Sequence, residues 1–212
     1  MYSVCLIGWG VLRGVGSVLN TAKVIPGSTV LVMGLGGVGL SVVQGARIAK
    51  AEKIIASDPV EERRSAALKL GATNVVDPSD NNLVNAVMEL TMGKGVDYAI
   101  DAVANSELIT LGLTVSKAGG STVIVGAPPP DEELKFPSSL HLMMSEKRLL
   151  GSLLGSCNAQ VDIPRLIDYW QSGQLDLRNM ISQTYSLEDI NLGIQDLRDS
   201  NGIRSVIKIH GS

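Results

Sequence analysis

A glycine-rich turn constrains the fold of this chain more than any other feature. Gly34, Gly36 and Gly39 form the pattern G-x-G-x-x-G directly after the apolar run 29–33 and before a stretch of small and apolar residues. In such a turn the first glycine lets the chain leave a strand sharply, the second lets backbone approach a diphosphate, and the third lets helix pack on strand. The diphosphate accepts hydrogen bonds from free N–H groups at the helix N-terminus. We therefore expect a dinucleotide-binding strand, turn and helix here.

The residues in and after the turn predict which dinucleotide fits. Gly37 and Val38 complete the turn, and Asp58 follows the last glycine by 19 positions, at the predicted end of the second strand. A carboxylate there accepts hydrogen bonds from both hydroxyls of an adenosine ribose and repels a 2′-phosphate, which favours NAD over NADP. Arg63 is a second candidate for the ribose, with an exposed helix face as the competing interpretation. Asp58 and Pro59 are also expected to open the next helix as its N-cap and first-turn residues.

The remaining pattern predicts the architecture around this turn. Short β-branched runs alternate with helical patterns from residue 29 onward, as in βαβ units. The six predicted strands are 29–33, 53–57, 74–76, 96–102, 121–125 and 148–153. The predicted helices between them are 38–49, 60–70, 82–91, 106–116 and 138–144. We expect an α/β fold with a doubly wound, six-stranded parallel sheet of the Rossmann type, which binds its ligand at the carboxyl ends of the strands.

The flanking segments lie outside this predicted sheet. A helix over 11–24 precedes it, and a helix over 163–171, a strand over 182–185, a helix over 187–198 and a strand over 204–210 follow it. We expect three parts: a linking segment and helix over 1–24, an NAD-binding domain over 25–155 and a C-terminal α+β appendage over 156–212. Ile190, Ile194 and Leu197 share one helix face that needs burial, either on the sheet domain or on a second subunit.

Composition argues against several classes of protein. The 212 residues are 45% hydrophobic, which suits a globular core, and a net charge of −3 with scattered basic residues argues against nucleic-acid binding. The longest apolar run is much shorter than the roughly 18 residues of a membrane helix. The N-terminal stretch lacks the basic start and cleavage site of a secretory leader. Cys5 and Cys157 are too far apart in sequence for a zinc knot, so we expect a cytoplasmic protein without structural disulfides.

Several segments besides the glycine turn carry a resemblance to a known family. They are CLIGWG at 5–10, LNTAKV at 19–24, PGSTV at 26–30, LGAT at 70–73, VDY at 96–98, VIVG at 123–126 and GIR at 202–204. With these segments the chain resembles, nearly end to end, the zinc-containing medium-chain alcohol dehydrogenases. The similar class includes the liver-type enzyme and glutathione-dependent formaldehyde dehydrogenase.

The resemblance implies a role for residues far from the glycine turn. The residues whose backbone would line the nicotinamide and bind its carboxamide are Val125, Ala127, Leu153 and Leu154. Val103 would contact the adenosine side, and Arg204 would reach the pyrophosphate. Core packing is the competing interpretation for the aliphatic residues, and an ordinary surface arginine is the competing interpretation for Arg204. The resemblance also implies a homodimer through the strand over 148–153.

The sequence departs from the family pattern at the reaction centre. The family's N-terminal catalytic domain, with its first zinc ligands and proton relay, has no counterpart in this sequence. Where the family presents a zinc-binding cysteine and a threonine facing the nicotinamide, this chain has Trp9 and Arg13. An indole has no lone pair for a metal, so we expect no zinc and assign no catalytic or metal-binding residue. The fixed charge of Arg13 is expected to favour NADH over NAD⁺.

The leading interpretation is therefore an NAD(H)-binding domain of a zinc-type alcohol dehydrogenase. Its family transfers hydride between an alcohol or aldehyde and nicotinamide, and we expect this chain to be inactive alone unless a catalytic domain is supplied in trans. A non-catalytic dimerisation or binding module is one alternative, and a zinc-independent reductase is another. A methyltransferase fits least, because the family resemblance is long.

Overall fold

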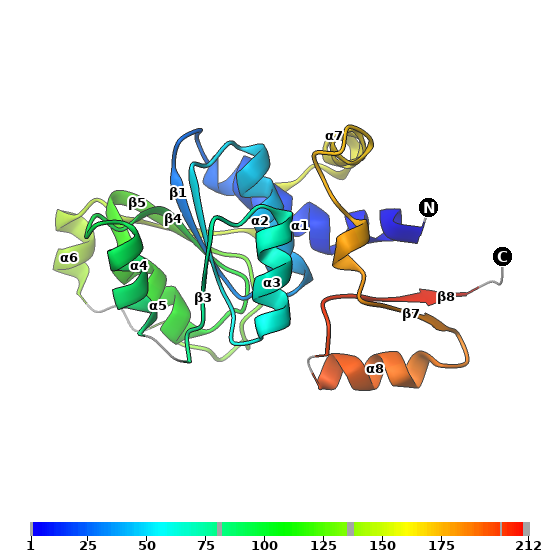
Figure 1. The fold of residues 1–212 in the computed structure, drawn as a ribbon. Helices are drawn as coiled ribbons and strands as arrows, with labels where there is room; N and C mark the ends of the chain where they lie inside the picture. The colour runs from blue at the N-terminus through cyan, green and yellow to red at the C-terminus, as the bar shows by residue number, and fades with distance from the viewer. Residues whose placement is uncertain (1, 80–81, 135–137, 200, 210–212) are drawn as a thin grey trace.

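The chain folds around a parallel sheet whose strand order is β3-β2-β1-β4-β5-β6 (Figure 1). The computed structural model describes residues 2–79, 82–134, 138–199 and 201–209. The strands are β1 (Thr29–Met33), β2 (Lys53–Ser57), β3 (Asn74–Val76), β4 (Val96–Asp101), β5 (Ser116–Ile124) and β6 (Arg148–Gly151). All neighbouring pairs in this sheet are parallel. The predicted α/β class and doubly wound six-stranded sheet are confirmed.

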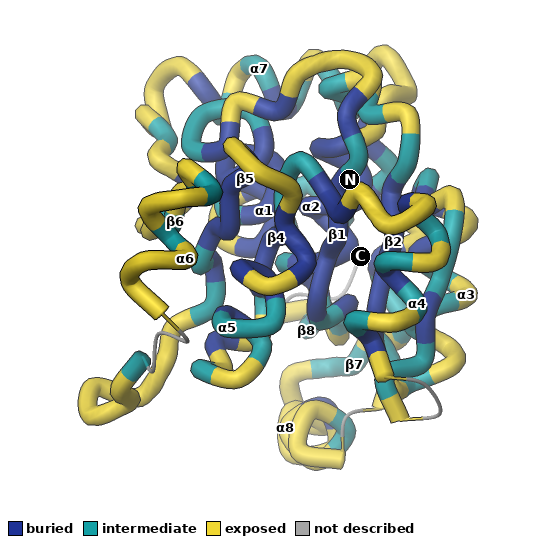
Figure 2. Tube along the Cα trace, turned by 90° about the vertical axis from the view of Figure 1, so that its left-hand side faces the viewer, coloured by how far each residue is buried: buried dark blue, intermediate teal, exposed yellow. Residues whose placement is uncertain are grey.

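Helices cover both faces of the sheet and create two apolar cores. The helices are α1 (Gly10–Gly16), α2 (Gly37–Ile48), α3 (Glu61–Leu70), α4 (Leu83–Leu90), α5 (Ser106–Val115) and α6 (Ser139–Met144). Side chains of β1 alternate between the cores: Val30 and Val32 pack with α1 and α2, whereas Leu31 and Met33 pack with α4. The central strands β1 and β2 are therefore buried on both sides, as their continuous apolar sequences predict (Figure 2).

One strand is longer than its sequence pattern indicates. β5 begins at Ser116 rather than 121, because a register shift against β4 accommodates the intervening residues. Val96 pairs with Ser116 and Tyr98 pairs with Ser121, so the glycine-containing segment between them forms a bulge. The carboxyl end of β5, which bears on the ligand site, lies within one residue of its predicted position.

The segment before β1 is not the single α-helix predicted for 11–24. A 3₁₀ helix over Tyr2–Gly8 is followed by α1 and then by a π-helical turn over Ser17–Ala22, which ends at Lys23 with φ 52°. Apolar periodicity does not separate α from π geometry over so short a stretch, so the prediction was wrong there. From the π turn, Thr21 bonds Ser152 at 2.7 Å and thereby ties this segment to the end of β6.

The C-terminal segment divides into a packed part and a projecting part (Figure 1). Its elements are α7 (Ala159–Gln171), β7 (Gln183–Ser186), α8 (Ile190–Arg198) and β8 (Ser205–Lys208), with β7 and β8 paired in parallel. Leu166, Leu175 and Met180 are buried in the same core as α1 and α2. The side chain of Gln44 also bonds the backbone of Asp176, as donor at 3.0 Å and as acceptor at 2.7 Å. Residues 159–180 thus stabilise the sheet domain directly.

The apolar face of α8 is largely uncovered. Ile190, Ile194 and Leu197 are 38%, 42% and 73% exposed, so the expectation that this face packs back on the sheet domain is wrong. The two short strands β7 and β8, which pack on one side of α8, extend away from the sheet, and no further layer of described residues covers the helix (Figure 1). Burial of this face by a second subunit stays a prediction.

Within the described ranges, every helix is too short or too polar to cross a membrane.

Candidate dinucleotide-binding site

The glycine turn has the three geometries that its spacing predicts. Gly34 lies in the left-handed region with φ 84°, and its N–H donates to the carbonyl of Ser57 at 2.8 Å. A Cβ at Gly39 would overlap the carbonyl oxygen of Gly34, so only glycine lets α2 approach β1 this closely. A Cβ at Gly36 would meet no atom within 4 Å. The space beside Gly36 is therefore free of described protein atoms, and we call it the cradle.

A single arginine supplies positive charge at this cradle. The guanidinium of Arg204 lies against the Cα of Gly37, at the start of α2, where the first-turn N–H groups have no acceptor within the helix. No carboxylate in the described ranges forms an ion pair with Arg204. Burial lowers the pKa of Arg204, yet a guanidinium stays protonated at neutral pH. The N-terminus of α2 and the Arg204 guanidinium thus lie side by side at the cradle, an arrangement that favours an anion.

Asp58 lies beside the turn, but it does not cap α3. One carboxylate oxygen accepts from the N–H of Leu35 at 2.7 Å and the other accepts from the N–H of Val60 at 2.9 Å. The chain bends at Pro59 and Val60 is the N-cap, so the predicted N-cap at Asp58 was wrong by two residues and the predicted helix start by one. A carboxylate accepts about four hydrogen bonds, which leaves capacity for the ribose hydroxyls. Arg63 lies 3.9 Å from the same carboxylate.

A second aspartate organises the neighbouring loop and was not predicted. Asp101 is fully buried at the end of β4, and its carboxylate accepts from the N–H groups of Val103 and Ala104 at 3.0 Å. Burial raises the pKa of Asp101, while the backbone donors oppose that rise. This loop places the half-exposed side chain of Val103 over Gly34, where a Cβ would overlap it. The sequence signal that could have identified Asp101 is an acidic residue near the end of a predicted apolar strand.

The residues expected around the nicotinamide lie beyond β5 and β6, at the same edge of the sheet. Val125 is fully buried and its N–H donates to the carbonyl of Asp101 at 2.9 Å. Ala127 is exposed two residues later. Leu153 is 84% exposed and Leu154 is 39% exposed with φ 50°, in the 3₁₀ turn Leu153–Ser156. The site residues named from the sequence therefore lie along the carboxyl ends of the strands.

Arg13 reaches into this second half of the site from α1. Its guanidinium donates to the carbonyl oxygen of Val125 and lies 5.8 Å from the ring centre of Trp9, which is 61% exposed. Arg13 and Val125 are separated by 112 positions in the sequence. The sequence placed both residues near the nicotinamide, but their mutual hydrogen bond was not predicted because it depends on how α1 packs.

The donor set at the expected zinc position does not fit a metal. Trp9 provides an N–H donor only, and no group of three His, Cys, Asp or Glu side chains lies together in the part of the chain that the structure describes. Burial near the carboxylate of Asp162 raises the pKa of Cys157 to about 11, so this thiol is protonated at neutral pH. Its Sγ donates weakly to the carbonyl of Leu12 at 3.4 Å. No reaction step through zinc follows from these residues.

Comparison with known proteins agrees with this arrangement. The family model described as zinc-binding dehydrogenase matches residues 37–172. The chain is 36% identical to an S-(hydroxymethyl)glutathione dehydrogenase of Synechocystis over 96% of its own length and 55% of the relative. It superposes on the benzyl alcohol dehydrogenase of Acinetobacter calcoaceticus with a TM-score of 0.92 at 31% identity, covering 96% of this chain and 56% of that one.

A further solved structure was determined with cofactor. This Sinorhizobium meliloti protein, described as a zinc-binding dehydrogenase bound to NADP, has a TM-score of 0.86 at 27% identity. The match covers 96% of this chain and 58% of that one. The chain spans about half the length of the curated relatives it matches. By its matched segment, its sheet order and its glycine turn, the chain belongs to the zinc-binding dehydrogenase family.

Proposed function

We propose that this chain binds NAD(H) at the glycine turn and serves as the cofactor-binding half of an alcohol or aldehyde oxidoreductase. The observation that carries this proposal is the open space at Gly36 beside the guanidinium of Arg204, which forms no ion pair with a carboxylate in the described ranges. When bound, NAD supplies the hydride acceptor and NADH the hydride donor; the chain's own residues only hold and orient it.

Each half of the ligand has its own residues. The diphosphate is held by the first-turn N–H groups at Gly37, Val38 and Gly39, together with Arg204. The adenosine ribose is held by Asp58, with Arg63 beside it. On the other side of the cradle, the backbone near Val125, Ala127, Leu153 and Leu154 faces the nicotinamide half.

The carboxylate of Asp58 is the basis for NAD rather than NADP as the preferred cofactor. It is already bound to two backbone N–H groups and would lie against a 2′-phosphate with like charge. We expect calorimetry to give at least tenfold tighter binding of NAD than of NADP. Asp58→Asn keeps an acceptor for the backbone but removes the charge, so it should narrow this ratio. Equal affinities in the unmodified protein would contradict this assignment.

We do not assign hydride transfer to this chain alone. The described residues contain no group of three His, Cys, Asp or Glu side chains that could hold a metal ion to polarise a substrate carbonyl. We expect no turnover of NAD with simple alcohols or aldehydes by the isolated protein. Turnover with a catalytic domain added in trans would support the half-enzyme role, whereas turnover without one would favour a zinc-independent reductase.

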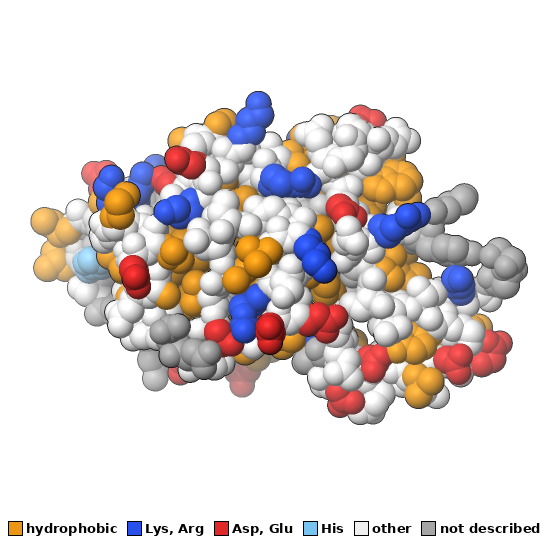
Figure 3. Space-filling view, viewed as in Figure 1, with side chains coloured by type: hydrophobic (Ala, Val, Ile, Leu, Met, Phe, Trp, Pro, Cys, Tyr) orange, Lys and Arg blue, Asp and Glu red, His pale blue; other side chains and the backbone are white. Residues whose placement is uncertain are grey.

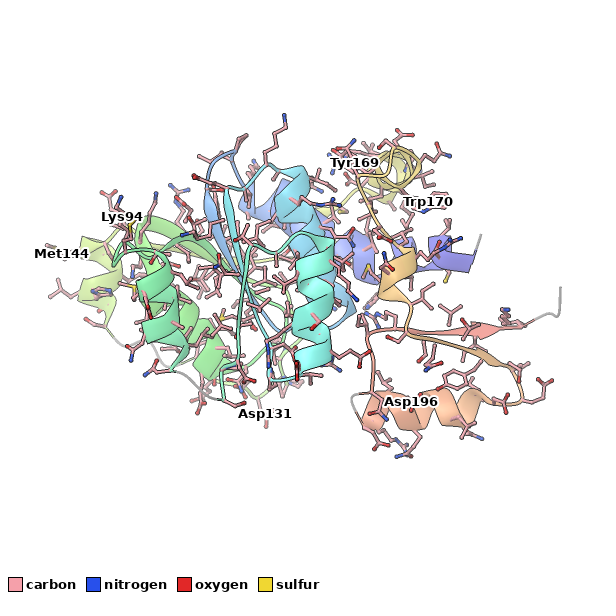
Figure 4. All side chains as sticks on the ribbon, in the orientation of Figure 1. Lys94, Asp131, Met144, Tyr169, Trp170 and Asp196 are labelled. Carbon is pink, nitrogen blue, oxygen red and sulfur yellow. The ribbon has the colours of Figure 1, made fainter. Side chains whose placement is uncertain are left out.

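We also propose that the protein forms a homodimer through β6. β6 is an edge strand, and the apolar side chains Leu140, Met143 and Met144 of the adjacent α6 are more than 60% exposed. They gather at one end of the molecule, where Met144 points outward (Figures 3 and 4). Uncovered apolar surface beside a free strand edge is a feature of association surfaces.

A substitution in β6 tests this dimer without disturbing the sheet. Ser152 donates to the carbonyl of Ile124 in β5, so the alternating N–H of Leu149 points away from β5. Leu149→Pro removes only that outward donor and should convert a dimer into a monomer in sedimentation velocity, while Leu149→Ala should remain dimeric. A wild-type monomer would contradict the proposal.

The cytoplasm is the compartment that we propose, because Cys5 and Cys157 form no disulfide, which suits a reducing environment.

A further inference from the structure

Arg13 occupies a polar position in the nicotinamide half of the site. Its guanidinium donates to the carbonyl oxygen of Val125, directly after β5, while its Nε is buried without an acceptor in the described ranges. The Trp9 ring, 5.8 Å away, shields the guanidinium on one side. The charge of Arg13 is therefore partly desolvated, and the hydrogen bond to Val125 is what compensates it.

Packing of α1 fixes Arg13 in this place. A Cβ at Gly155 would lie 2.6 Å from the carbonyl oxygen of Leu12 and 2.9 Å from that of Arg13. A Cβ at Gly16 would overlap Cys157 in the same contact. These close approaches hold α1 against the turn that follows β6. The backbone of Arg13 cannot withdraw without opening this contact, so only its side chain can leave the site.

The contact has a direct consequence for the ligand. A nicotinamide carboxamide carries N–H donors that need acceptors, and the side chains expected beside it beyond β6, those of Leu153 and Leu154, are apolar and supply none. The Val125 carbonyl oxygen already accepts from the charged Arg13 guanidinium. A carboxamide that bonds this oxygen must either displace the guanidinium and leave it without this partner, or share the oxygen and place its N–H donor against a cation. A charge-assisted hydrogen bond is stronger than the neutral one that would replace it. The diphosphate and adenosine half, with Gly36, Asp58 and Arg204, is unaffected by Arg13.

From this geometry, and resting on the proposed dinucleotide site, we propose that Arg13 closes the nicotinamide subsite in the isolated chain, so that the chain alone recognises the ADP-ribose part of its ligand and gains nothing from the nicotinamide. ADP-ribose, NAD⁺ and NADH should then bind alike. A purely electrostatic role for Arg13 would instead separate NAD⁺ from NADH, because only the oxidised ring is positively charged.

Calorimetric titration with ADP-ribose, NAD⁺ and NADH tests the proposal. For the unmodified protein we expect three dissociation constants within about threefold of one another. In Arg13→Met, which keeps the unbranched stem but no donor, the Val125 carbonyl is free, and NAD⁺ should bind about fivefold more tightly than ADP-ribose, the effect of one added hydrogen bond. Arg198→Met, at an exposed arginine of α8, is the control for loss of one charge and should leave the three constants alike.

The outcomes separate this proposal from the one on which it rests. If the unmodified protein binds NAD⁺ or NADH more than tenfold more tightly than ADP-ribose, the nicotinamide subsite is open and the proposal is wrong, while the dinucleotide site stands. An unchanged ratio in folded Arg13→Met would also overturn it. If none of the three ligands binds the folded protein, both proposals fail together. The three ligands are also compared in the unmodified protein, so the proposal can be refuted even if Arg13→Met does not fold.

Discussion

Gly36→Ala separates binding from folding at the cradle. Gly36 has φ −69°, which alanine adopts freely, and a Cβ there meets no protein atom within 4 Å. Reduced freedom of the unfolded chain gains about 0.4–1 kcal/mol, whereas alanine at an N-cap loses about 1 kcal/mol relative to glycine. The two effects nearly cancel. For a domain of this size, a residual 1 kcal/mol shifts the melting temperature by only about 2–4 °C.

The effect of Gly36→Ala on the ligand should be much larger. The added methyl group enters the space assigned to the diphosphate and prevents at least one charge-assisted hydrogen bond of about 1.5–3 kcal/mol. The dissociation constant for NAD should therefore rise by about 10- to 150-fold, measured by calorimetry. Gly8→Ala, at another glycine with open space around its Cβ, should bind NAD normally. Unchanged NAD affinity in folded Gly36→Ala would refute the assignment of the cradle.

Three further predictions follow from the same geometry. Arg204→Gln should weaken NAD binding about tenfold or more through loss of a charged donor to the diphosphate, and exposed Arg198→Gln should not; equal affinities would remove Arg204 from the site. Burial raises the folded-state pKa of Asp101, so the free energy of unfolding of the wild type, relative to Asp101→Asn, should fall as pH rises from about 4 to 7. Urea unfolding measures this difference, and a rise with pH would contradict the sign. Trp9 shares a pocket of about 180 Å³ with Arg204, so in Trp170→Phe the remaining tryptophan emission should change when NAD binds; constant emission at saturation would place the ligand elsewhere.

Local sequence signals predicted the architecture and the centre of the site. The glycine spacing reports contacts within one strand, turn and helix, so Gly34, Gly36 and Gly39 have the geometry expected of them. The parallel sheet followed from alternation of apolar runs and helical patterns, because parallel strands buried on both faces have a distinctive composition. Asp58 was predicted beside the turn, and the structure places it there.

Features set by long-range packing were not predictable in this way. Arg13 and Val125 were both predicted to lie near the nicotinamide. Their hydrogen bond joins residues 112 positions apart in the sequence and depends on how α1 packs on the turn after β6. The N-cap of α3 was misplaced because the Asp58 carboxylate accepts from the N–H of Leu35 in the glycine turn, a contact between distant parts of the sequence, and the helix is capped by Val60 instead. The uncovered face of α8 depends on what surrounds the chain, which amphipathic spacing alone does not specify.

Binding of NAD at the glycine turn is tested most simply by calorimetric titration of NAD into the unmodified protein, with folding verified by a cooperative melt. We expect saturable binding at one site per chain, with ADP-ribose competing for that site. Absence of saturable heat up to millimolar NAD, from a protein that is folded, would contradict it.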